Sequence, residues 1–554
     1  MPIHSFLDKG NHILNALRCA LLVVAIWSCS ALEAHAQSIE PSFNCAHAAT
    51  PGEHLICSDN YLAVLDQTLN TNFQALRESL TPNLQSRLVA GERLWLKNIS
   101  IVCGLTGNNP DLDYQHMPPI SCFQDQYRDR IAALKSMDAS KITEDPHRFH
   151  VVSQFGPSDK EILGSEPGTL IAGKSGEIYG ASGGALFKLT PPGAKGGAWT
   201  ANLLFRSDDF YTWPSWGLAV DSLGTLYVTT SETVFELKPP SELGAMWTAT
   251  TVWDFSDEGG QGSGPTASVI VGPDGALYGT TSGGYENKDG SVFRFARENG
   301  HWTKSVIWSF SQIDGDGSDP YGGLIMDASG VIYGTTSDGG NEGCGGFLES
   351  GCGIVFRLSP PLVRSDTWTE NVIYKFPGGQ GGGVPSSSLF MDATGALYGI
   401  SERGGLRMPY SSTGGGTVFK LSPPAPGGTE WTASVLHNFA GSPDIEAQGA
   451  GVLTGVVVDK SGAVFGVSVW GGFSNSGFLY MLTPPNFPDT GWKETIIHSF
   501  PPPDNGWSPR HGELHGLYLG SLIDVSGSIY GLESSYTTFP KDIGEADIFM
   551  IAPN

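Results

Sequence analysis

Charged side chains are scarce in this sequence, and basic ones are the scarcest. Of 554 residues only 16% are charged, and 31 Lys and Arg stand against 56 Asp and Glu, a net charge of −25. Proteins that bind nucleic acid need a basic face for the phosphates, so this composition excludes nucleic acid as a partner. A basic partner, by contrast, would be attracted over a long range.

Motifs of catalysis are also absent. The sequence contains no G-x-S-x-G, no Walker loop and no H-E-x-x-H. The Gly-rich stretch at 378–383 does not precede an expected helix, as a phosphate-binding loop would. We therefore expect no catalytic residue, no cofactor and no metal, and a protein that is not an enzyme.

Long apolar runs are missing beyond residue 32. The one apolar stretch, 19–32, follows Lys9 and Arg18 and precedes an A-x-A site at 34–36. At about 14 residues it is too short to span a bilayer, so residues 1–36 are predicted to be a signal peptide. Lipid attachment at Cys29 is less favoured, because Trp27 fits a lipobox poorly. The mature chain is expected in the periplasm or outside the cell, without a membrane span.

Cysteine is rare, but its number is informative. Six cysteines remain after the signal peptide: Cys45, Cys57, Cys103, Cys122, Cys344 and Cys352. An even count in an exported chain predicts disulfides. The first four allow three pairings, among which the sequence cannot choose; closeness in sequence favours Cys45–Cys57 and Cys103–Cys122. Cys344 and Cys352 are expected to close a hairpin. A zinc site with His47 and His54 is weaker, because no C-x-x-C pair exists.

Residues 38–140 are predicted to form a small helical bundle. Leucines and a phenylalanine between Leu62 and Leu80 recur at steps of three and four, which makes one apolar stripe on a helix that Ser58 or Asp59 can cap and that ends near Pro82. Two more stripes follow, at Leu84, Leu88 and Trp95, and at Phe123, Tyr127, Ile131 and Leu134. A core this small gains stability from disulfides. Trp95 is expected to be buried, and Asp66 to bond a neighbouring backbone group or an arginine.

This segment resembles the N-terminal domain of the lysozyme inhibitor LprI family. The resemblance rests on 45–58 (CAHAATPGEHLICS), on Leu65-Asp66, on 92–97 (ERLWLK), and on Cys122 with Tyr127, Arg130, Ile131 and Leu134. It implies an exported module and lysozyme as a partner. Residues 38–138 carry a net charge of only −4, so charge does not single out this domain as the site for a basic partner.

Residues 147–554 contain a sevenfold repeat. The pattern Gly-x-aliphatic-aromatic, usually followed by Gly, has its aromatic residue at Tyr179, Tyr227, Tyr278, Tyr333, Tyr398, Phe465 and Tyr530, with spacings of 48, 51, 55, 65, 67 and 65 residues. Each copy has four strand-like runs, which in the third copy are 267–271, 276–281, 291–295 and 302–310. Seven copies of four strands predict a seven-bladed β-propeller.

The ends of the repeat predict how the ring closes. The seventh copy has only three strands, the third of them at 548–551, while an extra strand, 149–155, precedes the first copy. This extra strand is expected to pair with 548–551, which removes an exposed edge. The recurring tryptophans are expected to pack between blades: Trp199, Trp247, Trp302, Trp368, Trp431 and Trp492.

The repeats resemble the GloVer family of exported bacterial proteins. The signature is present at 277–284 (LYGTTSGG) with 290–294 (GSVFR), and at 332–340 (IYGTTSDGG) with 353–361 (GIVFRLSPP). The resemblance names an architecture rather than an activity. No sorting anchor follows the repeats, which favours release or residence in the periplasm.

Two constellations are candidates for metal binding. Asp314, Asp316 and Asp319 are spaced like a calcium loop but lack its distal glutamate, so an ordinary turn is favoured. His511, Glu513 and His515 alternate as on one face of a strand, and a surface loop is favoured there.

The sequence therefore predicts an exported, monomeric binding protein of the bacterial envelope or secretome, with the propeller as the scaffold that recognises a glycan or a protein. One alternative is a lysozyme inhibitor acting through the helical domain. Another is a propeller carbohydrate-active enzyme, which would need carboxylate, His, Tyr or Arg groups to converge at the channel mouth.

Overall fold

The structure is a computed structural model of the whole chain. It describes residues 40–103, 119–136, 149–155, 167–182, 185–193, 199–206, 217–240, 247–256, 264–282, 289–311, 315–340, 351–361, 367–405, 414–439, 455–468, 477–485, 491–500, 518–519, 522–525, 527–534 and 546–551. The predicted signal peptide lies outside these residues. No described helix is long and apolar enough to cross a membrane.

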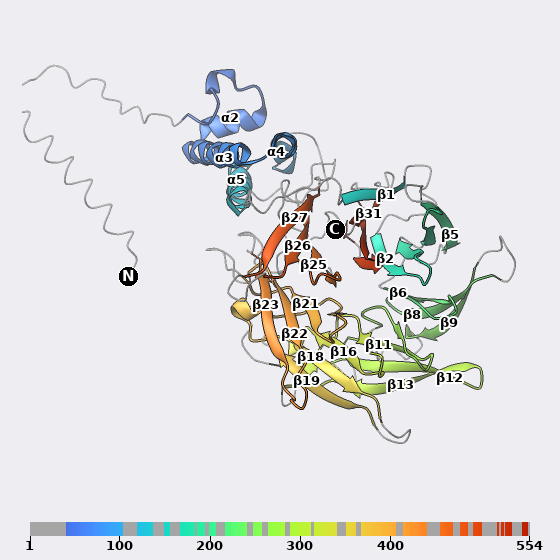
Figure 1. Cartoon of the computed structure of the whole chain (residues 1–554). Coiled ribbons are helices and arrows are strands. Elements are labelled where there is room, and N and C mark those ends of the chain that lie inside the picture. The colour runs from blue at the N-terminus through green and yellow to red at the C-terminus, as the bar shows by residue number, and fades with distance from the viewer. Residues whose placement is uncertain are drawn as a thin grey trace, which may run out of the picture.

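The N-terminal part is a bundle of helices (Figure 1). After a short 3-10 turn, η2 (Cys45–His47), come α2 (Pro51–Ser58), α3 (Asn60–Ser79), α4 (Pro82–Val102) and α5 (Pro119–Ser136). Asp59 caps α3 by accepting a hydrogen bond from the backbone N–H of Leu62. The three predicted stripes face one another, and their leucines, Phe123 and Tyr127 are buried, whereas Trp95 is half-buried.

Two disulfides hold this bundle. Cys45 is bonded to Cys57, and Cys103 to Cys122, which is the pairing that closeness in sequence favoured. Helix α2 was not predicted. It begins with a capping box, in which Thr50 accepts from the Glu53 backbone N–H while the Glu53 carboxylate accepts from the Thr50 N–H.

The rest of the chain is a seven-bladed β-propeller of four-stranded antiparallel blades, as predicted. Blades 1 to 3 are β2–β5, β6–β9 and β10–β13. Blade 4 is β15, β16, β18 and β19, and blades 5 and 6 are β20–β23 and β24–β27. Blade 7 takes β29, β30 and β31 from the end of the repeat and β1 from its start; β28 (Tyr518–Leu519) also pairs with β30, and β14 (Gly317–Ser318) pairs with β17 (Asp338–Gly339).

Within each blade, the strands run in order from the innermost to the outermost. The innermost strands are β2 (Pro167–Ala172), β6 (Gly217–Val220), β10 (Ile270–Val271), β15 (Ile325–Met326), β20 (Phe390–Met391), β24 (Val457–Val458) and β29 (Ile523–Val525). The second strands are β3 (Ile178–Ser182), β7 (Leu226–Thr229), β11 (Leu277–Thr281), β16 (Ile332–Thr336), β21 (Leu397–Ser401), β25 (Val464–Ser468) and β30 (Ser528–Ser534).

The third strands are β4 (Ala185–Thr190), β8 (Thr233–Lys238), β12 (Ser291–Glu298), β18 (Ile354–Ser359), β22 (Thr417–Ser422), β26 (Phe478–Thr483) and β31 (Ala546–Ile551). The outermost strands are β5 (Thr200–Arg206), β9 (Thr248–Asp254), β13 (His301–Ser309), β19 (Thr369–Lys375), β23 (Thr432–Asn438), β27 (Lys493–Ser499) and β1 (Phe149–Phe155).

The ring closes through β1, as the sequence predicted. Strand β1 pairs with β31 in antiparallel register, with Val151 opposite Phe549 and Ser153 opposite Ile548. On the inner side, β2 contacts β6 of the next blade and β29 and β30 of the last one. Blade 7 is thus built from two distant parts of the chain.

The glycine that recurs in the second strand of six of the seven blades is explained by packing inside the blade. A Cβ on Gly334 of β16 would lie 2.5 Å from the ring of Phe356 on β18, and Gly279 stands in the same way against Phe293. Blade 2 has Val228 at this position, and its partner Phe235 is half-buried rather than buried. Glycine in the second strand therefore lets the aromatic ring of the third strand pack fully against the sheet.

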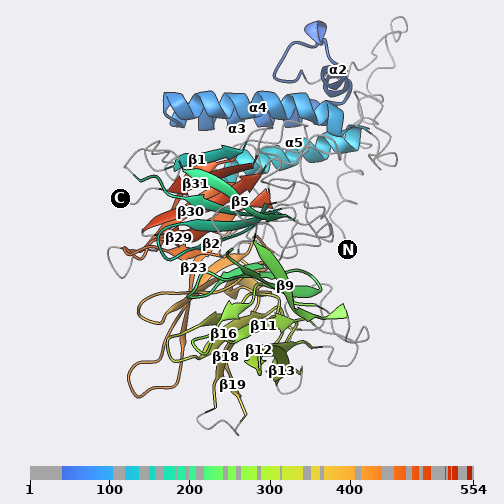
Figure 2. The ribbon, with the colours of Figure 1, turned by 90° about the vertical axis from the view of Figure 1, so that its right-hand side faces the viewer.

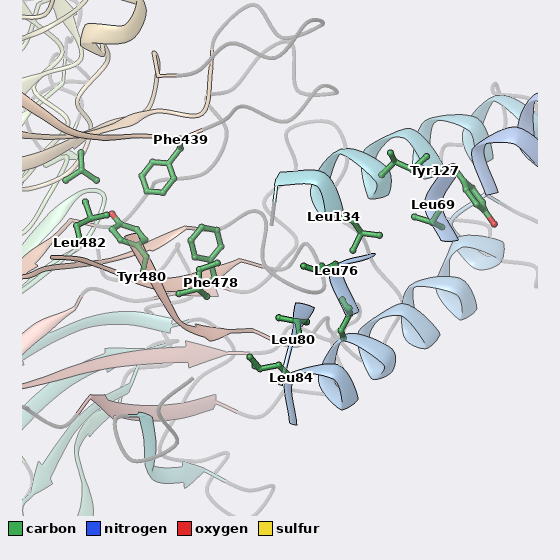
Figure 3. Packing of buried hydrophobic residues seen from close by; sticks show 14 of the residues in the cluster. Leu69, Leu76, Leu80, Leu84, Tyr127, Leu134, Phe439, Phe478, Tyr480 and Leu482 are labelled. Carbon is green, nitrogen blue, oxygen red and sulfur yellow. The ribbon is translucent and has the colours of Figure 1, made fainter. Parts of the chain in front are cut away.

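The bundle lies against the propeller (Figure 2). One cluster of buried hydrophobic side chains includes Leu80, Leu84 and Leu134 of the helices together with Phe478 and Tyr480 of blade 6. In Figure 3, Leu80 and Leu84 are at the end of the bundle that is nearest to Phe478.

Candidate functional site

The repeated tryptophans lie between blades, as expected. Trp302 of blade 3 packs edge-to-face on Tyr227 of blade 2, and Trp431 of blade 5 does the same on Tyr333 of blade 4. Trp368 meets Tyr278 in this way, and Trp199 of blade 1 meets Tyr530 of blade 7 across the closure. Trp247 and Trp492 pack against the clusters that contain Tyr179 and Tyr398.

In blades 3, 4 and 5, the repeat tyrosine is hydrogen-bonded to an aspartate of the turn that precedes its strand. In blade 4, the Asp327 carboxylate accepts hydrogen bonds from the backbone N–H groups of Ser329 and Val331, and the Tyr333 hydroxyl lies 3.4 Å from its other oxygen. Blade 5 repeats this arrangement, with 3.0 Å between the Tyr398 hydroxyl and Asp392. The aspartate-tyrosine pair therefore recurs in blades 3 to 5, and it fixes the position of a hydroxyl group in each of them.

The junction between blades 2 and 3 is bridged by an arginine. The guanidinium of Arg297, on β12, donates two hydrogen bonds of 2.6 and 2.5 Å to the Glu236 carboxylate of blade 2. The same guanidinium lies over the ring of Trp302, 4.6 Å from its centroid. Arg297 therefore links the two blades on the side where the tryptophan packs.

The junction between blades 4 and 5 contains a cavity. A cavity of about 870 Å³ is lined on one side by blade 4, with Asp327, Tyr333, Arg357 and Asn371. Blade 5 lines the other side with Met391 and with 423–424 and 428–431. We call this cavity the 4/5 groove. Its size is in the range of small-molecule sites.

One wall of the 4/5 groove is a stiff loop between β22 and β23. It contains Pro423, Pro424 and Pro426, and Gly428 donates a backbone hydrogen bond of 2.8 Å to the Ala425 carbonyl. Gly427, between them, has φ +84°. Proline followed by a glycine of positive φ is the pattern of a type II turn, which gives this part of the loop a defined conformation.

Charge in the 4/5 groove is mixed. Hydrogen bonds from Ser329, Val331 and Tyr333 outweigh the burial of Asp327 and leave its pKa below the usual value, so this carboxylate is ionised. Burial and the Asp327 charge raise the pKa of Tyr333, while Arg357 acts against them, so the phenol stays neutral and can donate a hydrogen bond. Glu430 is exposed at the rim. Two carboxylates and one guanidinium therefore line the groove.

The helical bundle has a polar core of its own. Asp66 accepts hydrogen bonds from the Ser42 backbone N–H at 2.6 Å and from the Tyr127 hydroxyl at 3.0 Å, in agreement with the expected backbone bond. Burial, with the Asp66 charge, raises the pKa of Tyr127 far above its usual value. Arg130 donates two hydrogen bonds to Glu92, and both side chains are buried.

Two family models match this chain. Residues 45–134 match the lysozyme inhibitor LprI, and residues 181–407 match the Gloeobacter/Verrucomicrobia repeat. The N-terminal helices are thus an LprI-like domain. The propeller that follows carries Gloeobacter/Verrucomicrobia repeats. No curated protein matches the chain.

Several solved structures are similar to this chain at low identity. The extracellular domain of a protein described as a hybrid two component system from B. thetaiotaomicron is 13% identical, with a TM-score of 0.40; the match covers 73% of this chain and 39% of that one. YCF48 from Cyanidioschyzon merolae is 13% identical (TM-score 0.40; 73% and 98% covered), and a gluconolactonase from Xanthomonas campestris is 14% identical (TM-score 0.32; 61% and 96% covered). This likeness concerns the fold alone.

The other predicted site residues are placed as follows. Asp316 accepts from the backbone N–H groups of Ser311 and Gly317, and Asp319 accepts from the Ser337 hydroxyl; burial raises the pKa of both carboxylates. Cys352 is buried and disulfide-bonded. Its predicted partner Cys344, together with Asp314, His511, Glu513 and His515, lies outside the described residues. Among the described residues, no three of His, Cys, Asp or Glu are grouped so that they could hold a metal ion.

The 4/5 groove was not predicted from the sequence, although two signals pointed to it. One is the proline- and glycine-rich segment 423–428, although its Pro-Pro pair recurs in other copies at 191–192, 239–240, 360–361 and 484–485. The other is Trp431, which was assigned to packing between blades. That assignment is correct, and the same side chain also lines the cavity.

Proposed function

We propose that this chain is an exported binding protein of the bacterial cell envelope, with the propeller as its recognition scaffold and the 4/5 groove as its ligand site. Several features support export: two disulfides in the LprI-like domain, a disulfide-bonded Cys352 and the signal-like N-terminus. Neither matching family is described by a catalytic activity.

The single observation that carries this proposal is the 4/5 groove. It brings together an aromatic side chain, several apolar side chains and charged or amide groups from two blades, and a ligand site can be built from such groups. The groove lies between two rigid blades, so a bound ligand would not have to order the site.

The test is capture of envelope material by residues 38–554. Peptidoglycan, envelope polysaccharide and envelope protein are sedimented separately with the protein, and we expect one of them to retain it. Trp431→Ala should abolish the retention, whereas Trp302→Ala, the equivalent tryptophan of the bridged junction, should keep it. Retention that is equal in wild type and Trp431→Ala would contradict the proposed site.

A second candidate function is lysozyme inhibition through the LprI-like domain. It is favoured by the match over 45–134, which extends across all the helices and both disulfides. Titration of a purified lysozyme with residues 38–554 tests it. Full lysozyme activity at micromolar excess of the protein would contradict this second function, and it would not bear on the proposed ligand site in the 4/5 groove.

A further inference from the structure

The lining of the 4/5 groove has two chemical sides. Trp431, Met391 and Val372 are apolar, while Arg357, Asn371 and Glu430 offer hydrogen-bond donors and acceptors. A sugar ring has the matching composition, because C–H groups cover its faces and hydroxyl groups surround its edge. A flat aromatic side chain next to charged, hydrogen-bonding groups suits such a ligand better than it suits a purely apolar one.

The charge of the groove favours neutral sugars over anionic ones. Asp327 and Glu430 contribute two negative charges, against one positive charge on Arg357. The whole chain adds a net charge of −25. An anionic glycan, whether a uronate or a phosphate ester, would be repelled from this site, whereas a neutral glycan would not.

The groove is also pre-shaped. Its wall is fixed by Pro423, Pro424 and the type II turn at 425–428, and the Tyr333 hydroxyl is held by Asp327. At the junction of blades 2 and 3, Arg297 reaches across to Glu236 instead. Glu236 lies opposite Tyr227 in blade 2. The residue at the same position in blade 4, opposite Tyr333, is Arg357, which lines the groove.

We propose that the 4/5 groove binds a neutral carbohydrate segment of one or two sugar residues, which packs against Trp431 and is hydrogen-bonded by Arg357 and Glu430. This inference rests on the proposed function, since it names the ligand class of the same site. Charge and the mixture of flat apolar and polar groups favour a glycan; a peptide is the competing occupant.

Calorimetric titration of residues 38–554 with cellobiose, maltose, laminaribiose, N,N′-diacetylchitobiose and digalacturonate tests the ligand class. We expect at least one neutral disaccharide to bind in the micromolar to millimolar range, and digalacturonate to bind roughly tenfold more weakly or not at all. Trp431→Ala should weaken the neutral sugar at least about tenfold, and Trp302→Ala should leave its Kd unchanged. Glu430→Gln should reduce the difference in Kd between the neutral disaccharide and digalacturonate.

Hydrogen exchange on the wild-type protein gives a readout that needs no variant. Saturating disaccharide should slow exchange at 423–431 but not at 297–302. Binding of no neutral sugar at millimolar concentration, or binding without protection of 423–431, would overturn the carbohydrate assignment. If envelope protein is still retained through Trp431 in that case, the groove is a peptide site and the proposed function stands; if no envelope fraction depends on Trp431, both fail.

Discussion

Gly334→Ala is the sharpest test of how the repeat packs. The added methyl group would lie 2.5 Å from Cζ and 2.9 Å from Cε1 of Phe356, and 2.9 Å from Cδ2 of Leu324. Phe356 is fully buried and Leu324 is 3% exposed, so neither side chain has free space to move into. One of them must leave its rotamer or the two strands must separate.

The magnitude follows from two opposing terms. Alanine in a strand is usually better than glycine by about 0.5–1 kcal/mol, because glycine loses more backbone entropy on folding. Overpacking a buried site costs about 1–3 kcal/mol. We therefore expect Gly334→Ala to lower the free energy of unfolding by about 1–2 kcal/mol, a loss where propensity alone predicts a gain.

Urea unfolding followed by tryptophan fluorescence measures this loss as a lower midpoint. Gly193→Ala is the matched control, because a Cβ there has no atom within 4 Å, and its midpoint should not fall. Phe356→Leu should recover part of the loss in the Gly334→Ala background, with a coupling of about 0.5–3 kcal/mol. A Gly334→Ala protein as stable as wild type, or strictly additive effects, would refute the packing argument.

Three further predictions concern other parts of the molecule. Replacing both Val151 and Ser153, which lie opposite Phe549 and Ile548, by Pro removes backbone N–H groups of β1, so the amides of 548–551 should exchange faster by mass spectrometry, and unchanged protection would mean that β1 does not close the ring. Arg130→Met leaves the Glu92 charge buried without its partner and should lower stability by about 3–5 kcal/mol in helical circular dichroism melts, with Glu92→Gln recovering part of it. Burial, with the Asp316 charge, raises the pKa of Glu370 to about 7, so the folded state binds this proton more tightly than the unfolded chain. Glu370 should therefore lower stability as pH rises from about 4.5 to 7, and Glu370→Gln should raise the melting temperature at pH 8 but not at pH 4; equal shifts at both would contradict this.

The control for the Glu370 prediction is Glu298→Gln. Glu298 is exposed, so its substitution should change the melting temperature little at either pH. For the proline pair, the control is Val306→Pro in β13, which should change exchange within blade 3 without reaching 548–551.

The architecture could be predicted from the sequence because it repeats. The sequence has seven copies of one pattern, an extra strand before the first copy and only three strands in the last. A closed ring in which the extra strand completes the last blade accounts for all of these features. A glycine within the second strand marks that strand in the sequence. The ring of Phe356, and the rings at the same position in other blades, occupy the space that a larger side chain would need. Periodic leucines marked the helices just as clearly.

Other features depend on information that periodicity does not contain. Helix α2 has only eight residues, too few for a stripe, although Thr50 and Glu53 at the spacing of a capping box announced its start. The inner strand of blade 3 was expected over 267–271, but only Ile270–Val271 pairs with the next strand. The 4/5 groove depends on where the side chains at a blade junction point. Arg297 bonds to the neighbouring blade and Arg357 lines the groove, and the sequence around each arginine does not show this difference.

The pairing of β1 with β31 has a consequence for biogenesis. When β1 emerges during synthesis, the strand that it must join has not yet been made, so blade 7 waits while every other blade is completed. Contacts between such distant parts of a chain form slowly and leave an unpaired strand exposed meanwhile. Completion of blade 7 would thus be the last step of folding, after the whole chain has been synthesised.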